Sequence, residues 1–241
     1  NAPLNFLPAT CLYVLVEHGM LLFIAEFDEK AANVCPRGTL ERILKKFDDL
    51  GLNAFAAFEY EFFVFNETPK SVREKNYNNL EPITPDWFGY SMIRNSTYLE
   101  LYQQLIDLGE PMDFPIEGIH SETGPGVLEA ALEVDKAMES ADKAALFKTY
   151  TKVLAQRNDL MATFMAKWSN DYPGQSGHIH ISLQNKDGSS AFYDPKGEHN
   201  MSTLQRPFVP GFHRLLPDFL CRVAPPHTSH RQMHTRAWTP T

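Results

Sequence analysis

The stretch AFAAFEYEFFVFN, residues 54–66, decides the fold of this chain because it reads as one long strand. Side chains on a strand alternate between its two faces, so Glu59 and Glu61 share one face while Phe58, Tyr60 and Phe62 share the other. Paired carboxylates in apolar surroundings repel each other and lose hydration unless cations or hydrogen bonds compensate. The pattern therefore indicates a divalent metal site or, alternatively, an antiparallel strand with a solvated face that carries two ordinary surface glutamates.

Length and composition describe a globular protein. The 241 residues are 43% hydrophobic and 12% aromatic, enough for one large domain or two small ones. A formal charge of −8 argues against nucleic-acid binding. Cys11, Cys35 and Cys221 are odd in number and widely spaced, so we expect no disulfide framework or zinc site and a reducing, cytoplasmic compartment. No apolar run is long enough to span a membrane, so no membrane partner is expected.

Apolar spacing and turn residues predict the other elements. Helices are expected from a Thr39 cap to Gly51, from Asn95 or Ser96 to Gly109, and from Ser140 or Asp142 to about Leu160. Strands are expected over 114–119, over 162–168 and around His178 and His180. Two apolar runs between Thr10 and Ala25 predict a hairpin or consecutive strands, and the polar segment 67–92 reads as a long loop.

Two further segments carry residues suited to chemistry. In GIHSETGPGVLEAALEV, residues 118–134, Glu122 and Glu129 flank a Gly-Pro-Gly turn that folds two strands back so that both carboxylates approach one point. In PGQSGHIHISL, residues 173–183, His178 and His180 share one strand face after a glycine-rich turn. Such a pair indicates metal ligation or phosphate contact, although lone strand histidines are usually ordinary core or surface residues.

Four pieces now stand in a fixed order along the chain: FEYEFF, the turn between Glu122 and Glu129, ATFMAKW, and GQSGHIHISL. Together they resemble the catalytic domain of the glutamine synthetase family, over roughly 56–238. The SGHIHISL form and Trp238 make the chain resemble the bacterial ligases that join glutamate to ammonia or to an organic amine, and the lens relative, more than the most familiar bacterial enzyme of the family. The resemblance implies an α+β fold with a curved, mostly antiparallel sheet flanked by helices. It also implies that residues 1–25 are a remnant or the end of an N-terminal β-grasp region, and that residues 26–241 are the catalytic domain, truncated at its C-terminal end.

The resemblance also assigns roles to individual residues. One implied metal site comprises Glu61, Glu122 and Glu129. Glu59 and His178 match two of the three ligands of another site, and hard oxygen ligands with one imidazole suit Mg²⁺ or Mn²⁺. The implied ATP-binding residues are His180 and Ser182. The implied substrate-binding residues are Gly174, Arg231 and Trp238, with Arg231 one place before Gln232, where the family has an arginine.

The activity that the resemblance implies is ATP-dependent amide formation at the γ-carboxyl of glutamate, with ammonia or an organic amine, through a γ-glutamyl phosphate. The implied partners are glutamate, ATP, and ammonia or an amine, in a homo-oligomeric ring that is a decamer or a dodecamer. Gln232 and the early end of the chain favour an alternative, a non-catalytic family member with a structural or binding role. We expect the 241-residue chain alone to be inactive.

Overall fold

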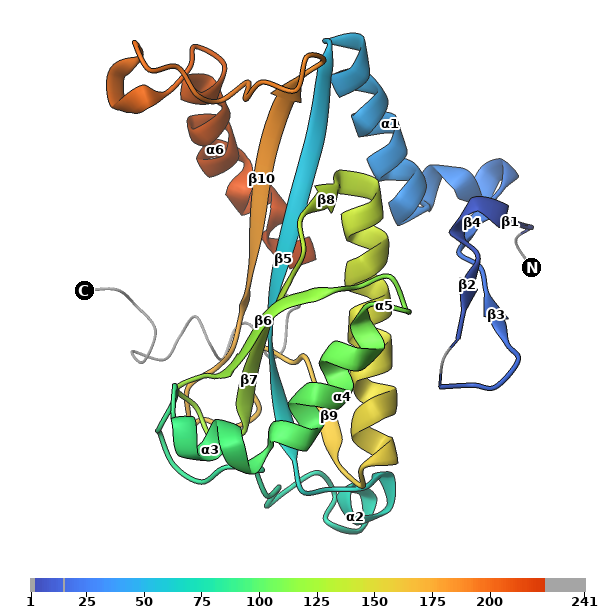
Figure 1. The fold of residues 1–241 in the computed structure, drawn as a ribbon, viewed down its shortest axis with the longest axis vertical. Coiled ribbons are helices and arrows are strands. Elements are labelled where there is room, and N and C mark those ends of the chain that lie inside the picture. Colours follow the sequence, from blue (N-terminus) through green and yellow to red (C-terminus); the bar gives the residue numbers. More distant parts are fainter. Residues whose placement is uncertain (1–2, 15, 224–241) are drawn as a thin grey trace.

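The fold is organised around one strand of 14 residues, β5 (Leu52–Phe65), in a computed structural model that describes residues 3–14 and 16–223. Its neighbours in the sheet are β10 (Gly177–Asn185), β7 (Val127–Leu132), β8 (Asp135–Lys136) and β9 (Met161–Thr163). Strand β6 (Ile116–Ser121) pairs with β7 and completes the order β10-β5-β7-β6 (Figure 1). All of these pairings are antiparallel, so the expected α+β fold with a mostly antiparallel sheet is confirmed.

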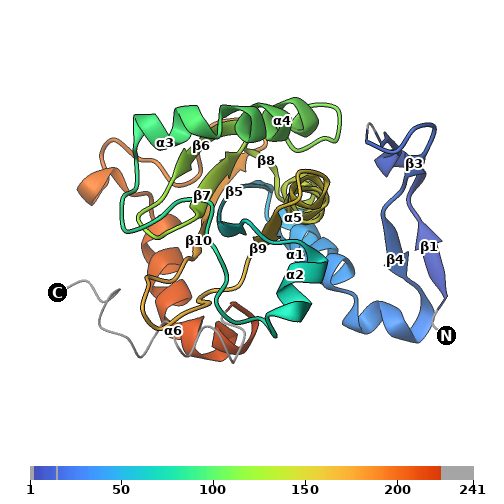
Figure 2. The same cartoon turned by 90° about the horizontal axis from the view of Figure 1, so that it is seen from below.

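The aromatic face of β5 forms the main core. Helices α4 (Leu99–Gly109) and α5 (Ala137–Arg157) cover this face (Figure 2). The ring of Phe147 on α5 lies 5.8 Å from Tyr60 and 5.9 Å from Phe62, and both strand residues belong to the same hydrophobic cluster. Each fully buried phenylalanine of this kind contributes about 1.5–3 kcal/mol to folding. The predicted alternation along residues 58–62 is therefore the alternation that builds the core.

The opposite face of β5 is divided into two halves. Towards the end of the strand, Phe63 and Phe65 are fully buried and pack against Trp168, with ring centroids 6.5 and 5.1 Å apart. Earlier on the same face lie Glu59 and Glu61. The apolar half anchors the sheet to the segment that connects β9 to β10, and the carboxylates lie beside that anchor.

The N-terminal ribbon, residues 4–14 and 16–27, lies to one side of the sheet (Figure 1), and its buried Val14 belongs to the main hydrophobic cluster. Strand β1 (Leu4–Phe6) pairs with β4 (Ala25–Phe27), and β2 (Leu12–Tyr13) pairs with β3 (Leu21–Leu22) as the expected hairpin. Short 3₁₀ helices span Pro8–Thr10 and Glu29–Val34. Arg37 on α1 (Pro36–Asp49) pairs with Glu26 of the ribbon and with Asp142 of α5, and so ties the ribbon to the helices.

Three further helices complete the described chain: α2 (Pro69–Glu74), α3 (Met92–Thr97) and α6 (Gln205–Val223), together with a 3₁₀ turn at Glu198–Asn200. Helix α6 runs beside β10 and contains Pro210 and Pro217 (Figure 1). Within residues 3–14 and 16–223, no helix combines the length and the apolar character needed to cross a membrane.

Three local predictions are wrong. Helix α1 begins at Pro36 with Cys35 as its N-cap, because proline at the first position favours a helix start; the Thr39 hydroxyl instead donates to the Cys35 carbonyl from inside the helix. The strand expected over 162–168 ends at Thr163, and the loop beyond it is held by Gln175, which donates to the carbonyls of Met165 and Ala166. The loop expected over 67–92 contains α2.

Candidate metal centre

The register of the sheet gathers acidic and imidazole side chains from four strands. Glu61 on β5 lies directly opposite Glu129 on β7, and Glu59 lies opposite His178 on β10. On the far side of β7, His120 of β6 lies opposite Glu129. One residue of slip in any of these pairings would turn the side chains to the other face, so the strand pairing itself builds the centre.

Glu129 lies at the middle of this centre. The Nδ1 atom of His178 lies 3.2 Å from Glu59 Oε2 and 3.7 Å from Glu129 Oε1. Two groups each have candidate ligand atoms within 4.8 Å of one another, Glu59–Glu129–His178 and His120–Glu122–Glu129. Glu61 belongs to neither group, although it faces Glu129 across the strand pair. The five residues that the resemblance assigns to metals therefore come together, with Glu129 shared between the two groups.

The turn between Glu122 and Glu129 has a fixed shape. Gly126 has a φ of +70°, and an added Cβ there would lie 2.5 Å from the carbonyl oxygen of Val64, so only glycine fits. The backbone N–H of Gly126 donates to the buried hydroxyl of Thr84 at 2.8 Å. The turn is thus held against β5, and this holds the two glutamates that flank it over the sheet.

Burial and like charge raise the proton affinity of these carboxylates. Burial raises the pKa of Glu61, and the Glu129 and Glu122 carboxylates add to the rise; only 4% of Glu61 is exposed. Burial and then Glu122 raise the pKa of Glu129 as well. Among the residues that the structure describes, the backbone N–H of Ser176 donates to the Glu61 carboxylate at 2.8 Å, and this hydrogen bond favours the ionised form. Within the described residues, the ion-pair partners of Glu59, Glu122 and Glu129 are all imidazoles.

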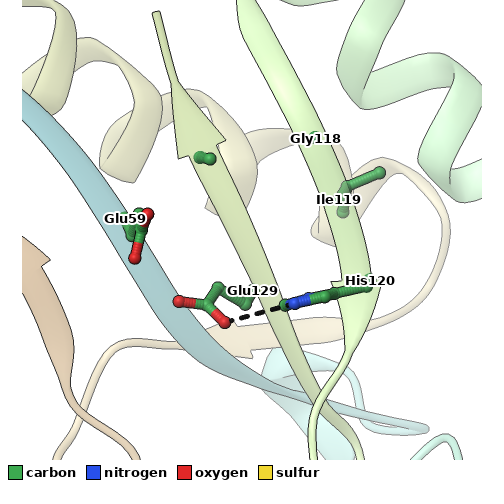
Figure 3. Close-up of a pocket in the computed structure, with 6 residues that line it drawn as sticks. Glu59, Gly118, Ile119, His120 and Glu129 are labelled. Atoms are coloured by element: carbon green, nitrogen blue, oxygen red, sulfur yellow. Dashed lines mark ion pairs between the residues drawn. The ribbon is translucent and has the colours of Figure 1, made fainter. Parts of the chain in front are cut away.

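The arrangement fits a divalent cation. Four carboxylates and an imidazole are a donor set of mainly hard oxygen atoms, which suits Mg²⁺ or Mn²⁺. Burial and, after it, the neighbouring glutamates raise the pKa values of Glu61 and Glu129, and a bound cation would favour the ionised form of both. A cavity of about 290 Å³ adjoins the carboxylates (Figure 3). Its wall contains Glu59, His120 and Glu129, together with the small residues Gly118 and Ala131.

The residues expected to bind ATP lie on the same strand as His178. His180 and Ser182 are exposed on β10, opposite Ala57 and Phe55, and His180 Nε2 lies 3.0 Å from Glu59 Oε1. Gly174 is buried in the loop before β10, two residues from the Ser176 N–H that Glu61 accepts. Arg231 and Trp238 lie outside the described residues. The structure therefore brings His180 to the carboxylates and places Gly174 in the adjoining loop, while Ser182 lies four residues farther along β10 from His178.

Sequence reasoning missed two residues at the centre, His120 and Tyr90. His120 could have been found, because it lies near the end of β6, two residues before Glu122, and alternate residues of an extended segment point to one side. Tyr90 carries no such signal: it lies 32 residues before Glu122, and its hydroxyl donates to Glu122 Oε1 at 2.5 Å. That hydrogen bond raises the pKa of Tyr90 to about 12.

Comparison with known proteins places the chain among relatives of one kind. The family described as "Glutamine synthetase, catalytic domain" matches residues 33–241. Type-1 glutamine synthetase 2 of Dictyostelium discoideum is 39% identical over 229 residues, which are 93% of this chain and 44% of that protein. Glutamate–isopropylamine ligase of a Pseudomonas species is 27% identical, over 91% of this chain and 48% of the ligase. The chain spans about half the length of these curated relatives.

Solved structures share the fold. A GmaS/ADP complex superposes with a TM-score of 0.85 over 99% of this chain and 54% of the other, at 19% sequence identity. A crystal structure of a glutamine synthase homolog superposes with a TM-score of 0.81 over 98% of this chain and 54% of the other, at 22% identity. At these identities the likeness concerns the fold, and it agrees with the predicted fold class.

Proposed function

Because the chain belongs to the glutamine synthetase catalytic-domain family, we propose that the full-length protein is an ATP-dependent ligase that joins the γ-carboxyl of glutamate to ammonia or an organic amine. The observation that carries the proposal is the convergence of Glu59, Glu129 and His178, whose candidate ligand atoms lie within 4.8 Å of one another. Glu61 and Glu122 flank this group. Carboxylates concentrated in this way serve chemistry that needs divalent cations beside phosphate groups.

In this proposal, Glu59 and His178 hold one Mg²⁺ or Mn²⁺ ion, and Glu61, Glu122 and Glu129 hold another. When bound, such ions neutralise the charge on phosphate oxygens. The side chains of His180 and Ser182 face the phosphates of ATP from β10, and the backbone at Gly174 faces the glutamate substrate. Arg231 and Trp238 complete the substrate site in the proposal.

The reaction proceeds in two steps. An oxygen of the substrate γ-carboxylate attacks the terminal phosphorus of ATP, the bond to the bridging oxygen breaks, and ADP leaves with γ-glutamyl phosphate formed. The amine nitrogen then attacks the acyl carbon, inorganic phosphate leaves, and the nitrogen loses a proton to give the amide.

The test is phosphate release by the full-length protein. With ATP, Mg²⁺, glutamate and an amine all present, we expect release that stops when either glutamate or the amine is omitted. The Glu59→Gln variant should lose the release, because it removes a proposed ligand and keeps the side-chain volume. Stable, folded protein without any phosphate release would contradict the ligase and favour the non-catalytic alternative, to which Gln232 points.

The acceptor amine is tested in the same assay. Relatives include proteins named for isopropylamine and for putrescine as well as glutamine synthetases. Product formation should therefore be compared for ammonia, methylamine, ethanolamine and putrescine. Equal rates with all four would contradict any specificity for one amine.

We also propose that the N-terminal ribbon is the end of a β-grasp region and meets a neighbouring subunit in a decameric or dodecameric ring. In support, the ribbon exposes Leu4 by 59% and Phe6 by 65%, which is unusual for apolar side chains unless they meet a partner. Light scattering of the full-length protein should give the molar mass of ten or twelve subunits. A stable, active monomer would contradict this. The cytoplasmic location stays a prediction.

A further inference from the structure

His120 faces two of the proposed ligands with one ring nitrogen. Its Nε2 atom lies 3.5 Å from Glu129 Oε2 and 3.8 Å from Glu122 Oε1. Figure 3 shows the ring extending from β6 across to the Glu129 carboxylate. Because His120 and Glu129 are directly paired across two strands, the backbone fixes this approach. The imidazole therefore interacts with both carboxylates from one side of the centre.

The other ring nitrogen of His120 is sealed from solvent. Nδ1 is inaccessible and has no hydrogen-bond partner among residues 3–14 and 16–223. Tyr90 packs edge-on against the ring, with centroids 5.2 Å apart and planes at 88°. The preceding Gly89 lies so close that an added Cβ would come within 2.7 Å of the Glu122 carbonyl carbon. The segment around Tyr90 thus fixes the orientation of the His120 ring.

These surroundings decide which nitrogen carries the proton. With the proton on Nδ1, a buried N–H would have no acceptor, and the Nε2 lone pair would point at two negative charges. With the proton on Nε2, the N–H points at both carboxylates. A metal ligand needs a lone pair on the coordinating nitrogen, so the favoured tautomer makes Nε2 a donor and unsuited to coordination.

The contrast with His178 supports this division. The His178 side chain is 58% exposed, so solvent can accept or supply a proton at the ring nitrogen that does not face Glu59. His178 can therefore present a lone pair from Nδ1 to a cation. Of the two imidazoles that approach the Glu129 carboxylate, the His178 side chain is the more exposed, at 58% against 40% for His120.

We propose that His120 is a positioning residue for the metal centre, an inference that rests on the proposed function. Its Nε2–H holds the carboxylates of Glu122 and Glu129 in the orientation in which they coordinate, and it offsets part of their repulsion. Hydrogen-bond donors behind metal ligands commonly set metal affinity by about 10–100-fold. His120 acts through the two glutamates and does not bind the metal.

The test compares two amides of different length in the full-length protein. In His120→Gln the amide nitrogen reaches the position of Nε2, whereas in His120→Asn it reaches only as far as Nδ1. Mn²⁺ affinity, measured from the electron paramagnetic resonance signal of unbound Mn²⁺, should fall about 10–100-fold in His120→Asn and stay within about threefold of wild type in His120→Gln. The KM for Mn²⁺ should follow the same pattern.

A matched control and an unfolding measurement complete the test. His199→Asn changes an exposed histidine with a φ of +57°, which asparagine tolerates, and it should leave Mn²⁺ affinity unchanged. Equal urea midpoints of His120→Asn and His120→Gln would show that folding does not explain the difference in affinity.

Three outcomes would overturn the inference. If both His120 variants bind Mn²⁺ as tightly as wild type does, His120 does not orient the Glu122 and Glu129 carboxylates for metal binding. If both lose Mn²⁺ affinity and also lose any preference for Mn²⁺ over Mg²⁺, the imidazole is itself a ligand. If the wild-type protein binds no Mn²⁺, the proposed function fails together with the inference, and this outcome is distinguishable from the other two.

Discussion

Glu61 and Glu67 lie six residues apart, and their pKa values are shifted in opposite directions. Both are buried, with 4% and 1% of their surfaces exposed. Burial alone would raise the pKa of Glu67. The Lys75 ammonium at 2.5 Å, the Ser71 hydroxyl at 2.6 Å and the Glu81 N–H at 3.1 Å together lower it instead. Burial raises the pKa of Glu61, which has neighbouring glutamates and, within residues 3–14 and 16–223, one backbone donor, Ser176.

The difference distinguishes a carboxylate that stabilises the fold from one that, in the proposed function, binds a cation. A buried carboxylate with a cation and donors holds its surroundings together, since its charge is compensated within the chain. Carboxylates that are left mutually repelling destabilise the fold slightly and become useful when a cation arrives. The contacts of Glu67 therefore account for its burial. In the proposed function, a bound cation compensates the charges of Glu61 and Glu129. The following experiments separate the two roles.

The largest effect is expected for Glu129→Gln, because Glu129 belongs to both candidate ligand groups. Mn²⁺ affinity of the full-length protein should fall about 100-fold or more, since loss of a ligand exceeds the effect of losing an outer hydrogen bond. The free energy of unfolding without metal should stay the same or rise, because the variant removes like-charge repulsion. Titration with Mn²⁺ and urea unfolding measure the two quantities. Unchanged Mn²⁺ affinity in Glu129→Gln would contradict the proposed role of this carboxylate group in binding a cation, and with it the contrast between Glu61 and Glu67.

The reverse pattern is expected for Glu67→Gln. The neutral amide loses the ion pair with Lys75 and weakens the hydrogen bonds, so the free energy of unfolding should fall by about 2 kcal/mol. The figure stays modest because Lys75 is partly exposed and regains hydration. Mn²⁺ affinity should be unchanged. Urea unfolding checks the first expectation, and a variant as stable as wild type would show that the Glu67 contacts contribute little.

The stabilisation from Glu67 should also depend on pH in a defined direction. Its pKa is lowered in the folded protein, so its contribution is present above the unfolded value, about 4.3, and is lost as the pH falls through the lower folded value. The difference in unfolding free energy between wild type and Glu67→Gln should therefore shrink as the pH falls from about 6 to about 3. Urea midpoints at several pH values measure it. A constant difference would mean that charge is not responsible.

The comparison also shows how far the sequence predicts this molecule. The alternation in residues 58–62 predicts both the aromatic core and the carboxylate face, because a strand has only two faces. The turn at residues 124–126 and the His178–His180 spacing predict the other strands of the centre for the same local reason. The structure brings Glu59 and His178 close to Glu129, and Glu122 close to Glu129 as well. That these residues and Glu61 serve one metal centre is what the family resemblance implies, and it stays a prediction.

What the sequence does not predict depends on contacts between distant segments. Helix α2 has six residues in a polar stretch, and it is held by the Thr68–Ser71 capping box and the burial of Val72. The segment after Thr163 looks apolar enough for a strand but packs Trp168 under β5 instead. Tyr90 reaches Glu122 only because the loop folds back. Local periodicity does not encode contacts between distant segments, so the secondary structure of segments that depend on such contacts is assigned wrongly from propensity alone.

The smallest effect, Ser71→Ala, would sharpen the account of Glu67. The Ser71 hydroxyl donates to Glu67 at 2.6 Å and also accepts from the Thr68 N–H in the capping box. Its removal leaves the Lys75 ion pair in place, so the free energy of unfolding should fall by only about 1 kcal/mol, as for a typical cap or hydrogen bond. Urea unfolding of Ser71→Ala beside Glu67→Gln measures the ratio. Equal losses of unfolding free energy in Ser71→Ala and Glu67→Gln would assign the stabilisation by Glu67 to the Ser71 hydroxyl. A smaller loss in Ser71→Ala would assign the larger share to the charge of Lys75, and Glu61 has no such cation among the described residues.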